Sequence, residues 1–247
     1  MNNSEYIFGI RAVMEALQAG KDLNKVFVKK DLQGDLAREL MPMLREHEVP
    51  VFRVPQEKLY RITRKNHQGV IAMLSPVTYY KLDQIVPTLY EEGLLPFIVL
   101  LDGLTDTRNF GAIARTAECA GVHTVVIPDR GSVTVNADAE KTSAGALMHL
   151  PVCRVRSIAD AVRYLKDAGV KVVAATEKTD SFYTAVDYTG PVAIVMGAED
   201  TGISREVLAL CDDRAAIPMS GTIGSLNVSV AAGVLIYEVV RQRLAAE

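Results

Sequence analysis

The 247-residue sequence has few of the residues that cross-link a chain or bind metals. Its three cysteines, Cys119, Cys153 and Cys211, are odd in number and form no Cys-x-x-Cys pair. Such a sparse set is typical of reducing compartments and argues against a zinc ribbon or a redox motif. The four histidines are scattered without the spacing of a metal site, so we expect no bound metal.

Long apolar runs are also missing. The longest uncharged apolar stretch, 228–237, covers about half of the roughly 20 residues that a membrane-spanning helix needs. A secretory signal, basic and then apolar, is absent from the first residues, MNNSEYIFGIR. We therefore expect a cytoplasmic protein that has no membrane partner.

The composition is that of an ordinary globular protein, with 49% hydrophobic and 23% charged residues, which excludes disordered and collagen-like classes. The net charge of −3 is unevenly distributed. Residues 1–75 hold 12 basic and 9 acidic side chains, whereas residues 76–247 hold 15 basic and 21 acidic ones. A basic part attached to an acidic remainder indicates contact with a polyanion, although an excess of three charges also arises by chance.

Residues 1–75 alternate between helical and extended patterns and predict a small α/β domain. Ile10, Val13, Met14 and Leu17 form one apolar helix face that ends before Gly20. The remaining elements that we expect in this domain are strands at 26–28, 49–54 and 69–74, and helices at 36–46 and after Pro55. The less periodic stretch 76–96, which contains three prolines, is predicted to be a linker.

Residues 97–247 show a stronger alternation of strand and helix. Phe97–Leu101 is apolar throughout, as in a strand covered on both faces. Further strands are predicted at 124–127, 152–155, 170–174, 192–196 and 215–217, with helices at 111–120, 138–145, 159–168, 205–210 and 227–244. This order predicts an α/β fold with a mostly parallel sheet, whose functional loops follow the carboxyl ends of the strands.

Several familiar enzyme motifs are absent. No Gly-x-Gly-x-x-Gly opens a predicted helix, which argues against a dinucleotide site. Gly197 and Gly202 have the outer spacing of a phosphate-binding loop, but Ile203 stands where its lysine is required. A Gly-x-Ser-x-Gly elbow is also missing. Dehydrogenase, kinase and hydrolase functions are therefore disfavoured.

Three glycine-rich loops follow three of the predicted strands, and such loops let backbone amides approach a ligand closely. Their sequences are Asn109-x-Gly-x-Ile-x-Arg-Thr-Ala117, Met196-Gly-Ala-Glu-x-x-Gly-Ile203, and Ile217-Pro-Met-x-x-x-x-x-Ser-Leu-Asn-Val-Ser-x-Ala231. Together they resemble, in order and context, the three motifs of the SpoU (SPOUT) family of RNA ribose 2′-O-methyltransferases, which use S-adenosylmethionine.

Two further motifs lie near the ends of the first domain, Phe8-Gly-Ile-Arg-Ala-Val13 and His67-Gln-Gly-Val70. They resemble a subgroup of that family that methylates a guanosine of bacterial large-subunit (23S) ribosomal RNA, and whose extra domain is similar to ribosomal protein L30e. The resemblance thus covers nearly the whole chain, and it implies a deep trefoil knot in residues 97–247 and a homodimer.

The resemblance also assigns site residues. The cofactor pocket would be lined by Gly197, Glu199, Ile217, Met219, Leu226, Asn227 and Ser229. The catalytic neighbourhood would contain Asn109, Arg115, Glu199 and Asn227. Taken one at a time, these residues have simpler explanations: Asn109 and Asn227 as helix caps, and Arg115 and Glu199 as surface charges. Their joint occurrence favours function.

A ribose 2′-hydroxyl attacks well only when its proton is removed during the attack. The family is thought to use the arginine at position 115 for this activation. An arginine is always protonated, so we favour a role in which Arg115 binds the adjacent phosphate and stabilises the developing alkoxide. In this hypothesis Glu199 orients Arg115, while Asn109 and Asn227 fix loops or the ribose.

The densest cationic stretch lies in the basic first domain, and its residues suited to phosphate contact or base stacking are Lys58, Tyr60, Arg61, Arg64 and Lys65. We predict that they bind RNA, although a solvated surface gives the same pattern. Three alternatives stay open for the whole chain. In the first, the methylated substrate is a transfer RNA or another ribosomal site. In the second, the protein is a non-catalytic ribosome-assembly factor. In the third, it is an α/β enzyme with a different nucleotide cofactor.

Overall fold

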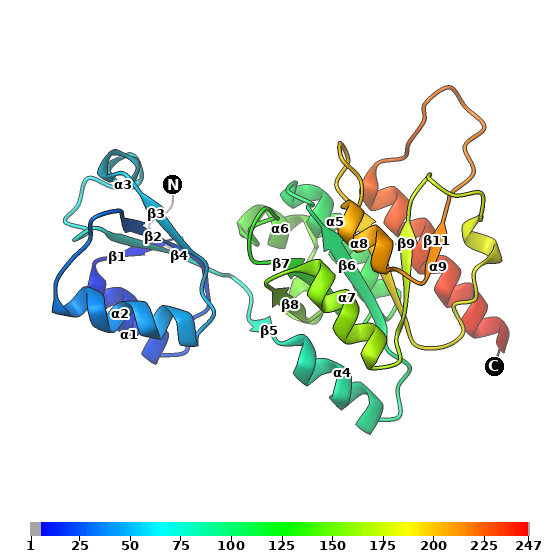
Figure 1. Cartoon of the computed structure of the whole chain (residues 1–247), viewed down its shortest axis with the longest axis horizontal. Coiled ribbons are helices and arrows are strands. Elements are labelled where there is room, and N and C mark those ends of the chain that lie inside the picture. The colour runs from blue at the N-terminus through cyan, green and yellow to red at the C-terminus, as the bar shows by residue number, and fades with distance from the viewer. Residues whose placement is uncertain (1–5, 247) are drawn as a thin grey trace. The chain divides into compact units, whose positions relative to one another are not determined.

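A computed structural model describes residues 6–246 and divides the chain into two compact units between Thr78 and Tyr79. No helix in this described part of the chain is long and apolar enough to cross a membrane. Both units alternate strands with helices (Figure 1), as the sequence pattern predicts.

The first unit is a four-stranded sheet with helices on both faces. In chain order its elements are β1 (Tyr6–Phe8), α1 (Ile10–Gln18), β2 (Leu23–Lys29), α2 (Asp35–Glu46), β3 (Val51–Val54), α3 (Gln56–Ile62) and β4 (Val70–Leu74). The strand order is β1-β4-β2-β3, and only β2 and β3 run parallel. Helices α1 and α2 pack on one face, over Val26, Val28, Val70 and Ala72, and α3 lies on the opposite face (Figure 1).

The two motifs that flank the first domain meet in space. Helix α1 starts after Gly9 and has no side-chain cap of its own. The side-chain oxygen of Gln68 accepts a hydrogen bond from the Ile10 N–H at 3.1 Å, and the Gly9 N–H donates to the Val70 carbonyl at 3.0 Å. Because the first N–H groups of a helix lack partners within it, Gln68 acts as a remote cap. This contact explains why the two motifs occur together.

The second unit contains a seven-stranded sheet with the order β11-β9-β10-β6-β7-β8-β5. Every neighbouring pair is parallel, which confirms the predicted mostly parallel α/β sheet. In chain order its elements are β5 (Tyr79–Tyr80), α4 (Leu82–Glu91), β6 (Phe97–Asp102), α5 (Thr107–Cys119), β7 (Thr124–Pro128), α6 (Ala137–Thr142), the short helix Ala146–Met148, β8 (Val152–Val155), α7 (Ile158–Asp167), β9 (Lys171–Ala175), the short helix Tyr183–Ala185, β10 (Val192–Gly197), α8 (Arg205–Leu210), β11 (Asp213–Ala215) and α9 (Val228–Ala246).

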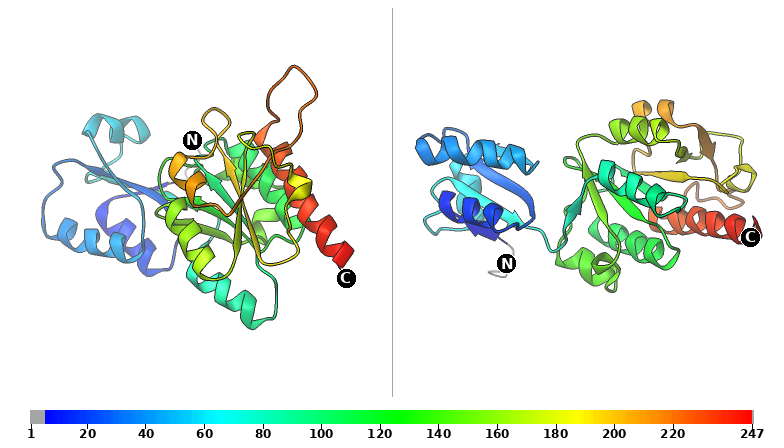
Figure 2. Two further views of the ribbon diagram at one scale, coloured as in Figure 1. Left: turned by 45° about the vertical axis from the view of Figure 1, so that its right-hand side comes forward. Right: turned by 90° about the horizontal axis from the view of Figure 1, so that it is seen from below.

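Helices cover both faces of this sheet (Figure 2). On one face α4, α7 and α8 pack against alternate strand residues such as Ile98, Leu100 and Val195. On the other, α5 packs against α6 and α9, and α9 contacts β10. Strands β7 and β8 lie on one side of β6, and β10 lies next to β6 on the other side. The direction in which strands are added to the sheet therefore reverses at β6. In open α/β sheets the ligand crevice lies at such a reversal, so the carboxyl ends of β6 and β10 are the expected site.

The stretch 76–96, expected to be a linker, is structured in its greater part. Residues 79–80 form β5, which pairs with β8, and residues 82–91 form α4. Leu82, Val86 and Leu89 of α4 are buried in the core of the second unit. Pro87 interrupts the apolar spacing of this helix, so the sequence pattern does not predict α4. A chain that starts near Pro96 would lose this packing, so a truncation belongs near Tyr79.

Other elements also differ from the sequence expectation. Strand β11 spans Asp213–Ala215, two residues before the expected 215–217. Strand β1 was not predicted, because three residues are too few for an alternating pattern to be recognised. Helix α5 starts at Thr107, four residues before the expected start, because the carboxylate of Asp106 accepts a hydrogen bond from the Asn109 N–H at 2.7 Å.

The close approach of α6 to α5 depends on Gly111, which belongs to the first of the three SpoU-like motifs and lies on α5. A Cβ atom at this position would lie 2.7 Å from the Ala139 carbonyl oxygen and 2.7 Å from the Thr142 Cβ. Gly111→Ala improves helix propensity by up to about 1 kcal/mol, but the contact with a backbone oxygen cannot be relieved without moving α6. Asn109 stands two residues earlier on the same helix.

We therefore predict that Gly111→Ala destabilises the second unit by roughly 1–3 kcal/mol, a fall in Tm of roughly 2–10 °C. Thermal unfolding followed by circular dichroism measures this change. Gly190→Ala is the matched control, because a Cβ at position 190 meets no atom within 4 Å. An unchanged Tm for Gly111→Ala would mean that α5 and α6 separate at no cost.

Candidate active site

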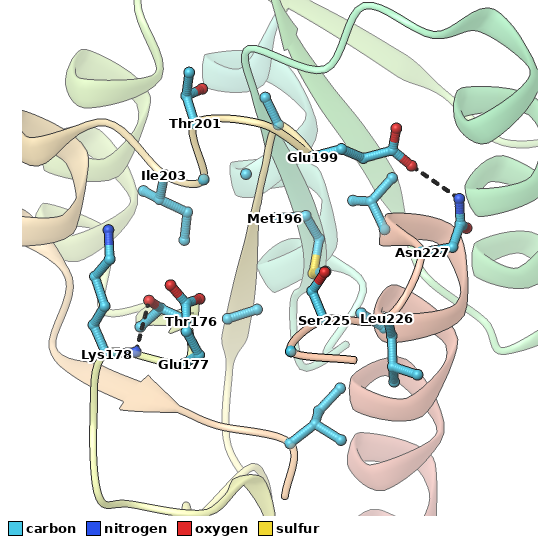
Figure 3. Close-up of a pocket in the computed structure, with 18 of the residues that line it drawn as sticks. Thr176, Glu177, Lys178, Met196, Glu199, Thr201, Ile203, Ser225, Leu226 and Asn227 are labelled. Atoms are coloured by element: carbon cyan, nitrogen blue, oxygen red, sulfur yellow. Dashed lines mark hydrogen bonds between the residues drawn. The ribbon is translucent and has the colours of Figure 1, made fainter. Parts of the chain in front are cut away.

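A carboxylate and two amides join three segments that are far apart in the sequence. The side-chain NH₂ groups of Asn109 and Asn227 each donate to Glu199 Oε1, both at 2.9 Å. Asn227 Nδ2 also lies 3.0 Å from Asn109 Oδ1. Figure 3 shows the link between Glu199 and Asn227. The structure thus brings together three of the four residues predicted to be catalytic, in a cluster that we name the Asn-Glu-Asn junction.

Asn109 does not cap its helix. Asp106 occupies the cap position and accepts from the Asn109 backbone, which leaves the Asn109 side chain free to reach Glu199. The simpler explanation of Asn109 as a helix cap is therefore wrong.

Asn227 both caps helix α9 and takes part in the Asn-Glu-Asn junction. Its Oδ1 accepts from the Ser229 N–H at 3.0 Å, as in a capped helix, and from the Ser229 hydroxyl at 2.6 Å. Because a backbone N–H can only donate, Oδ1 faces α9 and Nδ2 faces Glu199. The cap at the start of α9 therefore fixes the orientation of the amide at the junction.

Glu199 is held in a tight loop between β10 and α8. Ala198 and Gly202 exchange two backbone hydrogen bonds, at 3.2 and 2.9 Å, which folds the loop back on itself. A Cβ at Gly197 would lie 2.2 Å from the Gly202 carbonyl carbon, so only glycine allows this close approach. Gly197 is thus required by the loop itself, and a substitution there would displace Glu199 before it filled the pocket.

A cavity of about 580 Å³ opens beside the junction, at the carboxyl ends of β9, β10 and β11, within the size range of small-molecule sites (Figure 3). Six of the seven residues predicted to bind the cofactor line it: Gly197, Glu199, Ile217, Met219, Leu226 and Asn227. Ser229 does not line the cavity, and its hydroxyl instead holds Asn227.

One wall of the cavity was missed in the sequence analysis. Thr176, Glu177 and Lys178 directly follow β9 and line the cavity opposite Leu226 (Figure 3). The Thr176 hydroxyl accepts from the Lys178 N–H at 3.2 Å, which fixes this turn. The available signal was their position after an apolar strand, because parallel strands end at the same edge of a sheet.

Arg115 lies apart from the junction. It is exposed on α5, six residues after Asn109, which corresponds to about 120° around the helix. Its guanidinium has no hydrogen-bond or ion-pair partner among residues 6–246. Glu199 accepts from the two asparagines and not from Arg115, so the expectation that Glu199 orients Arg115 is not met in this structure.

Two of the three cysteines are unsuited to act as nucleophiles at neutral pH. Burial raises the pKa of both Cys153 and Cys211 to about 11, so neither is a thiolate at neutral pH. No group of three or more histidine, cysteine or acidic side chains suited to a metal ion gathers in residues 6–246.

The residues predicted to bind RNA lie together on the first unit. Lys58, Tyr60 and Arg61 are on α3, Arg64 and Lys65 are in the loop after it, and all five are exposed. The Tyr60 ring packs against His67, with ring centroids 5.1 Å apart. The Lys58 and Lys65 ammonium groups lie 5.2 and 5.7 Å from the ring centroids of Phe27 and Phe8.

Both units are similar to known families. Residues 96–237 match the SpoU rRNA Methylase family, and residues 6–80 match the RNA 2′-O ribose methyltransferase substrate-binding family. A TrmH family tRNA/rRNA methyltransferase of Staphylococcus haemolyticus is 38% identical over 237 residues, which are 96% of this chain and 95% of that protein.

Solved structures agree with these matches. The SpoU methyltransferase AviRb of Streptomyces viridochromogenes, in complex with the cofactor AdoMet, is similar with a TM-score of 0.60 and 28% identity, over 97% of this chain and 90% of that one. The AdoMet-bound rRNA methyltransferase of Sinorhizobium meliloti has a TM-score of 0.61 and 26% identity, over 96% and 87% of the two chains.

The fold and the site, taken with these similarities, define an RNA methyltransferase. The chain belongs to the SpoU methylase family, which confirms the resemblance drawn from its three loops.

The junction predicts that Asn227→Asp separates stability from activity. Aspartate caps a helix as well as asparagine does, so the start of α9 should be kept and Tm should fall only through the lost contact with Glu199. The variant loses the donor to Glu199 and places two carboxylates side by side, so methyl transfer should fall roughly 10- to 100-fold, the worth of a hydrogen bond to a charged group. Asn227→Ala, which loses the cap as well, is the control and should lower Tm. Wild-type activity in Asn227→Asp would remove the junction from the active site.

Proposed function

We propose that the protein transfers a methyl group from S-adenosylmethionine to a ribose 2′-hydroxyl of RNA, and that the target is a guanosine of 23S ribosomal RNA. The single observation that carries this proposal is the Asn-Glu-Asn junction beside a cavity of suitable size, built by the loops that match the SpoU family. Two similar structures hold AdoMet, and one of them is an rRNA methyltransferase.

The cavity residues fit this cofactor. Met196, Ile203 and Leu235 offer an apolar wall to an adenine ring, and Glu177 offers a carboxylate to a hydroxyl or an amine. Among the described residues, the backbone N–H groups of 219–226 have no acceptor, so they remain available to a ligand. When bound, S-adenosylmethionine supplies an electrophilic methyl group. The loops hold it in place, since positioning contributes much of the rate of such a transfer.

Arg115 is proposed to act on the RNA. Its guanidinium is exposed and has no carboxylate partner among residues 6–246, so it is available to a phosphate. Since it stays protonated, it stabilises negative charge on the ribose oxygen and does not remove the proton. Asn109, Glu199 and Asn227 hold the loops that carry the acceptor and the donor at fixed positions.

The expected result for Arg115→Ala is a loss of methyl transfer with cofactor binding intact. Loss of a transition-state donor costs roughly 2–4 kcal/mol, or about 30- to 10³-fold in rate. A methylation assay beside a calorimetric titration with S-adenosylmethionine measures both quantities. Arg115→Lys, which keeps the charge but not the planar fork, should lose less. Near wild-type activity in Arg115→Ala would refute the assigned role.

The RNA target is tested by mapping methylated riboses in cells that lack the gene. Loss of one 2′-O-methylguanosine from 23S ribosomal RNA, restored by the wild-type gene, supports the proposal. Loss from a transfer RNA, an activity that the name of the similar Staphylococcus protein also includes, would replace the ribosomal target. A protein that only assembles ribosomes would leave every methylation unchanged.

The division of labour follows the two units. The first unit, including residues 1–75 of the basic L30e-like domain, is proposed to bind RNA in the cytoplasm, and residues 97–247 to bind the cofactor in a knotted domain. The loops after β9, β10 and β11 surround one cavity, which supports the assignment of cofactor binding to this unit.

We also propose a homodimer formed through α9. Val230, Tyr237 and Leu244 are 52%, 50% and 65% exposed, and their seven-residue spacing places them on one stripe of the helix. Ile236 and Val239 on the opposite side are buried against the unit. Helix α9 thus has one apolar side packed against its own unit and another exposed to solvent. An exposed apolar side of this kind is typical of a helix that packs against a second protein chain.

Tyr237→Glu is therefore expected to convert the dimer to a monomer, because it places a charge in the centre of the stripe. Analytical ultracentrifugation measures the mass. Leu94→Glu, at a residue 41% exposed but outside α9, is the matched control and should remain dimeric. A dimeric Tyr237→Glu protein would assign the contact to another surface.

A further inference from the structure

The sheet of the first unit carries a row of phenylalanines on the face away from α1 and α2. Phe8 on β1 pairs with Ile71 on β4, Ile71 pairs with Phe27 on β2, and Phe27 pairs with Phe52 on β3. Directly paired residues point to the same face, so these four side chains form one line across all four strands. We name Phe8, Phe27 and Phe52 the aromatic row. The Phe27 and Phe52 ring centroids are 6.0 Å apart.

The aromatic row borders the core beneath α3 and is not its buried centre. The small core beneath that helix is aliphatic, with Leu59 and Ile71 completely buried and Val54 only 5% exposed. The three rings pack around this core and remain half-buried. In the second unit Phe97 and Phe110 are at most 1% exposed, whereas Phe182 is 51% exposed. The rings of the aromatic row are therefore more accessible than the phenylalanines at the centre of a core, although they contact the core beneath α3.

Lysines gather above these rings. The ammonium groups of Lys25 and Lys58 lie 5.9 and 5.2 Å from the Phe27 centroid, and that of Lys65 lies 5.7 Å from the Phe8 centroid. Burial lowers the pKa of Lys25, and the Lys58 ammonium lowers it further. Neither Lys58 nor Lys65 forms an ion pair with a carboxylate in residues 6–246. Lys58 and Lys65, two exposed cations without a carboxylate partner among the described residues, are complementary to a polyanion.

We propose that unpaired nucleotides of the RNA stack on the aromatic row, while Lys25, Lys58 and Lys65 contact the adjacent phosphates. Aromatic rings flanked by cations are the chemistry by which proteins bind single strands, since every base has a face that stacks. A paired helix hides its bases and offers only phosphates and hydroxyls, so the aromatic row selects an unpaired segment of the RNA. The inference rests on the proposed function, in that the substrate is RNA.

The test compares ring removal with ring retention in the full chain. Phe27→Leu/Phe52→Leu should weaken binding of a short single-stranded RNA at least about 30-fold, since each of the two bases stacked on these rings contributes about 1–3 kcal/mol. Binding of an RNA duplex should be unchanged. Phe27→Tyr/Phe52→Tyr, which restores both rings, should bind the single strand at least fivefold more tightly than the leucine pair. Fluorescence anisotropy measures all three affinities.

A salt titration separates stacking from charge. The leucine pair should keep the wild-type slope of log affinity against log salt, because no phosphate contact is lost. Lys58→Gln/Lys65→Gln should reduce that slope by about 1.4 if each lysine contacts one phosphate of a single strand. An unchanged slope in the lysine pair, or wild-type affinity in the leucine pair, would overturn the inference.

Photo-crosslinking of the wild-type chain gives an answer that is independent of mutant folding. A single-stranded RNA containing 5-iodouridine should form adducts at Phe8, Phe27 or Phe52. Adducts confined to α3, to residues 63–69 or to the second unit would refute the aromatic row as a stacking surface, while RNA binding itself stands. A wild-type chain that binds neither RNA form and methylates no RNA would instead refute the proposed function, and would leave a protein partner for this surface.

Discussion

The constraint on which the active site depends is that one carboxylate oxygen, Glu199 Oε1, accepts hydrogen bonds from two asparagines that lie 90 and 28 residues away in the chain. Neither asparagine is held only by this contact. Asn109 stands on a helix whose start is fixed by Asp106, and Asn227 is itself the cap of α9. A shift of either helix therefore breaks a contact to a charged group, which costs more than the loss of a neutral one. The junction couples the positions of α5, α9 and the loop after β10.

The topology of the sheet makes this junction possible. Strands β6 and β10 are neighbours although they are remote in sequence, and their register pairs Gly197 with Asp102. Asp102 in turn accepts from the Ser204 N–H at 2.7 Å, so the loop that carries Glu199 is fixed at both ends. Because helices cover both faces of the sheet, a slip of register would force side chains of different size into two close-packed cores. The rigid sheet is what allows irregular loops to hold a defined site.

The sequence predicts the strands and helices of the second unit well where the apolar pattern is long, as for Phe97–Leu101 or Arg205–Leu210. It predicts the loop residues only through their similarity to a family, because periodicity carries no information about hydrogen bonds between segments. Neither periodicity nor similarity to a family predicts two features of the site. Ser229 serves Asn227 and not the cavity, and Gly197 is required by its own loop. Both depend on distances between atoms, which residue types and spacing do not contain. Helix α4 was not predicted because Pro87 is a local signal against a helix. The burial of α4 against the sheet, which stabilises it, is visible only in the tertiary structure.

The charge distribution decides how an enzyme of this kind retains its RNA. Residues 76–247 carry 21 acidic and 15 basic side chains, so the part that holds the active site repels a polyanion on average. At physiological salt, charges act over about 8 Å, so the few cations near the site work only on a phosphate already next to them. Long-range attraction must therefore come from residues 1–75, which carry an excess of three basic side chains. Three charges steer RNA weakly, because affinity grows with the number of phosphates that are neutralised. An additional source of affinity that does not depend on charge is required, and half-buried rings beneath lysines supply it, because stacking is insensitive to salt while the lysines align the strand.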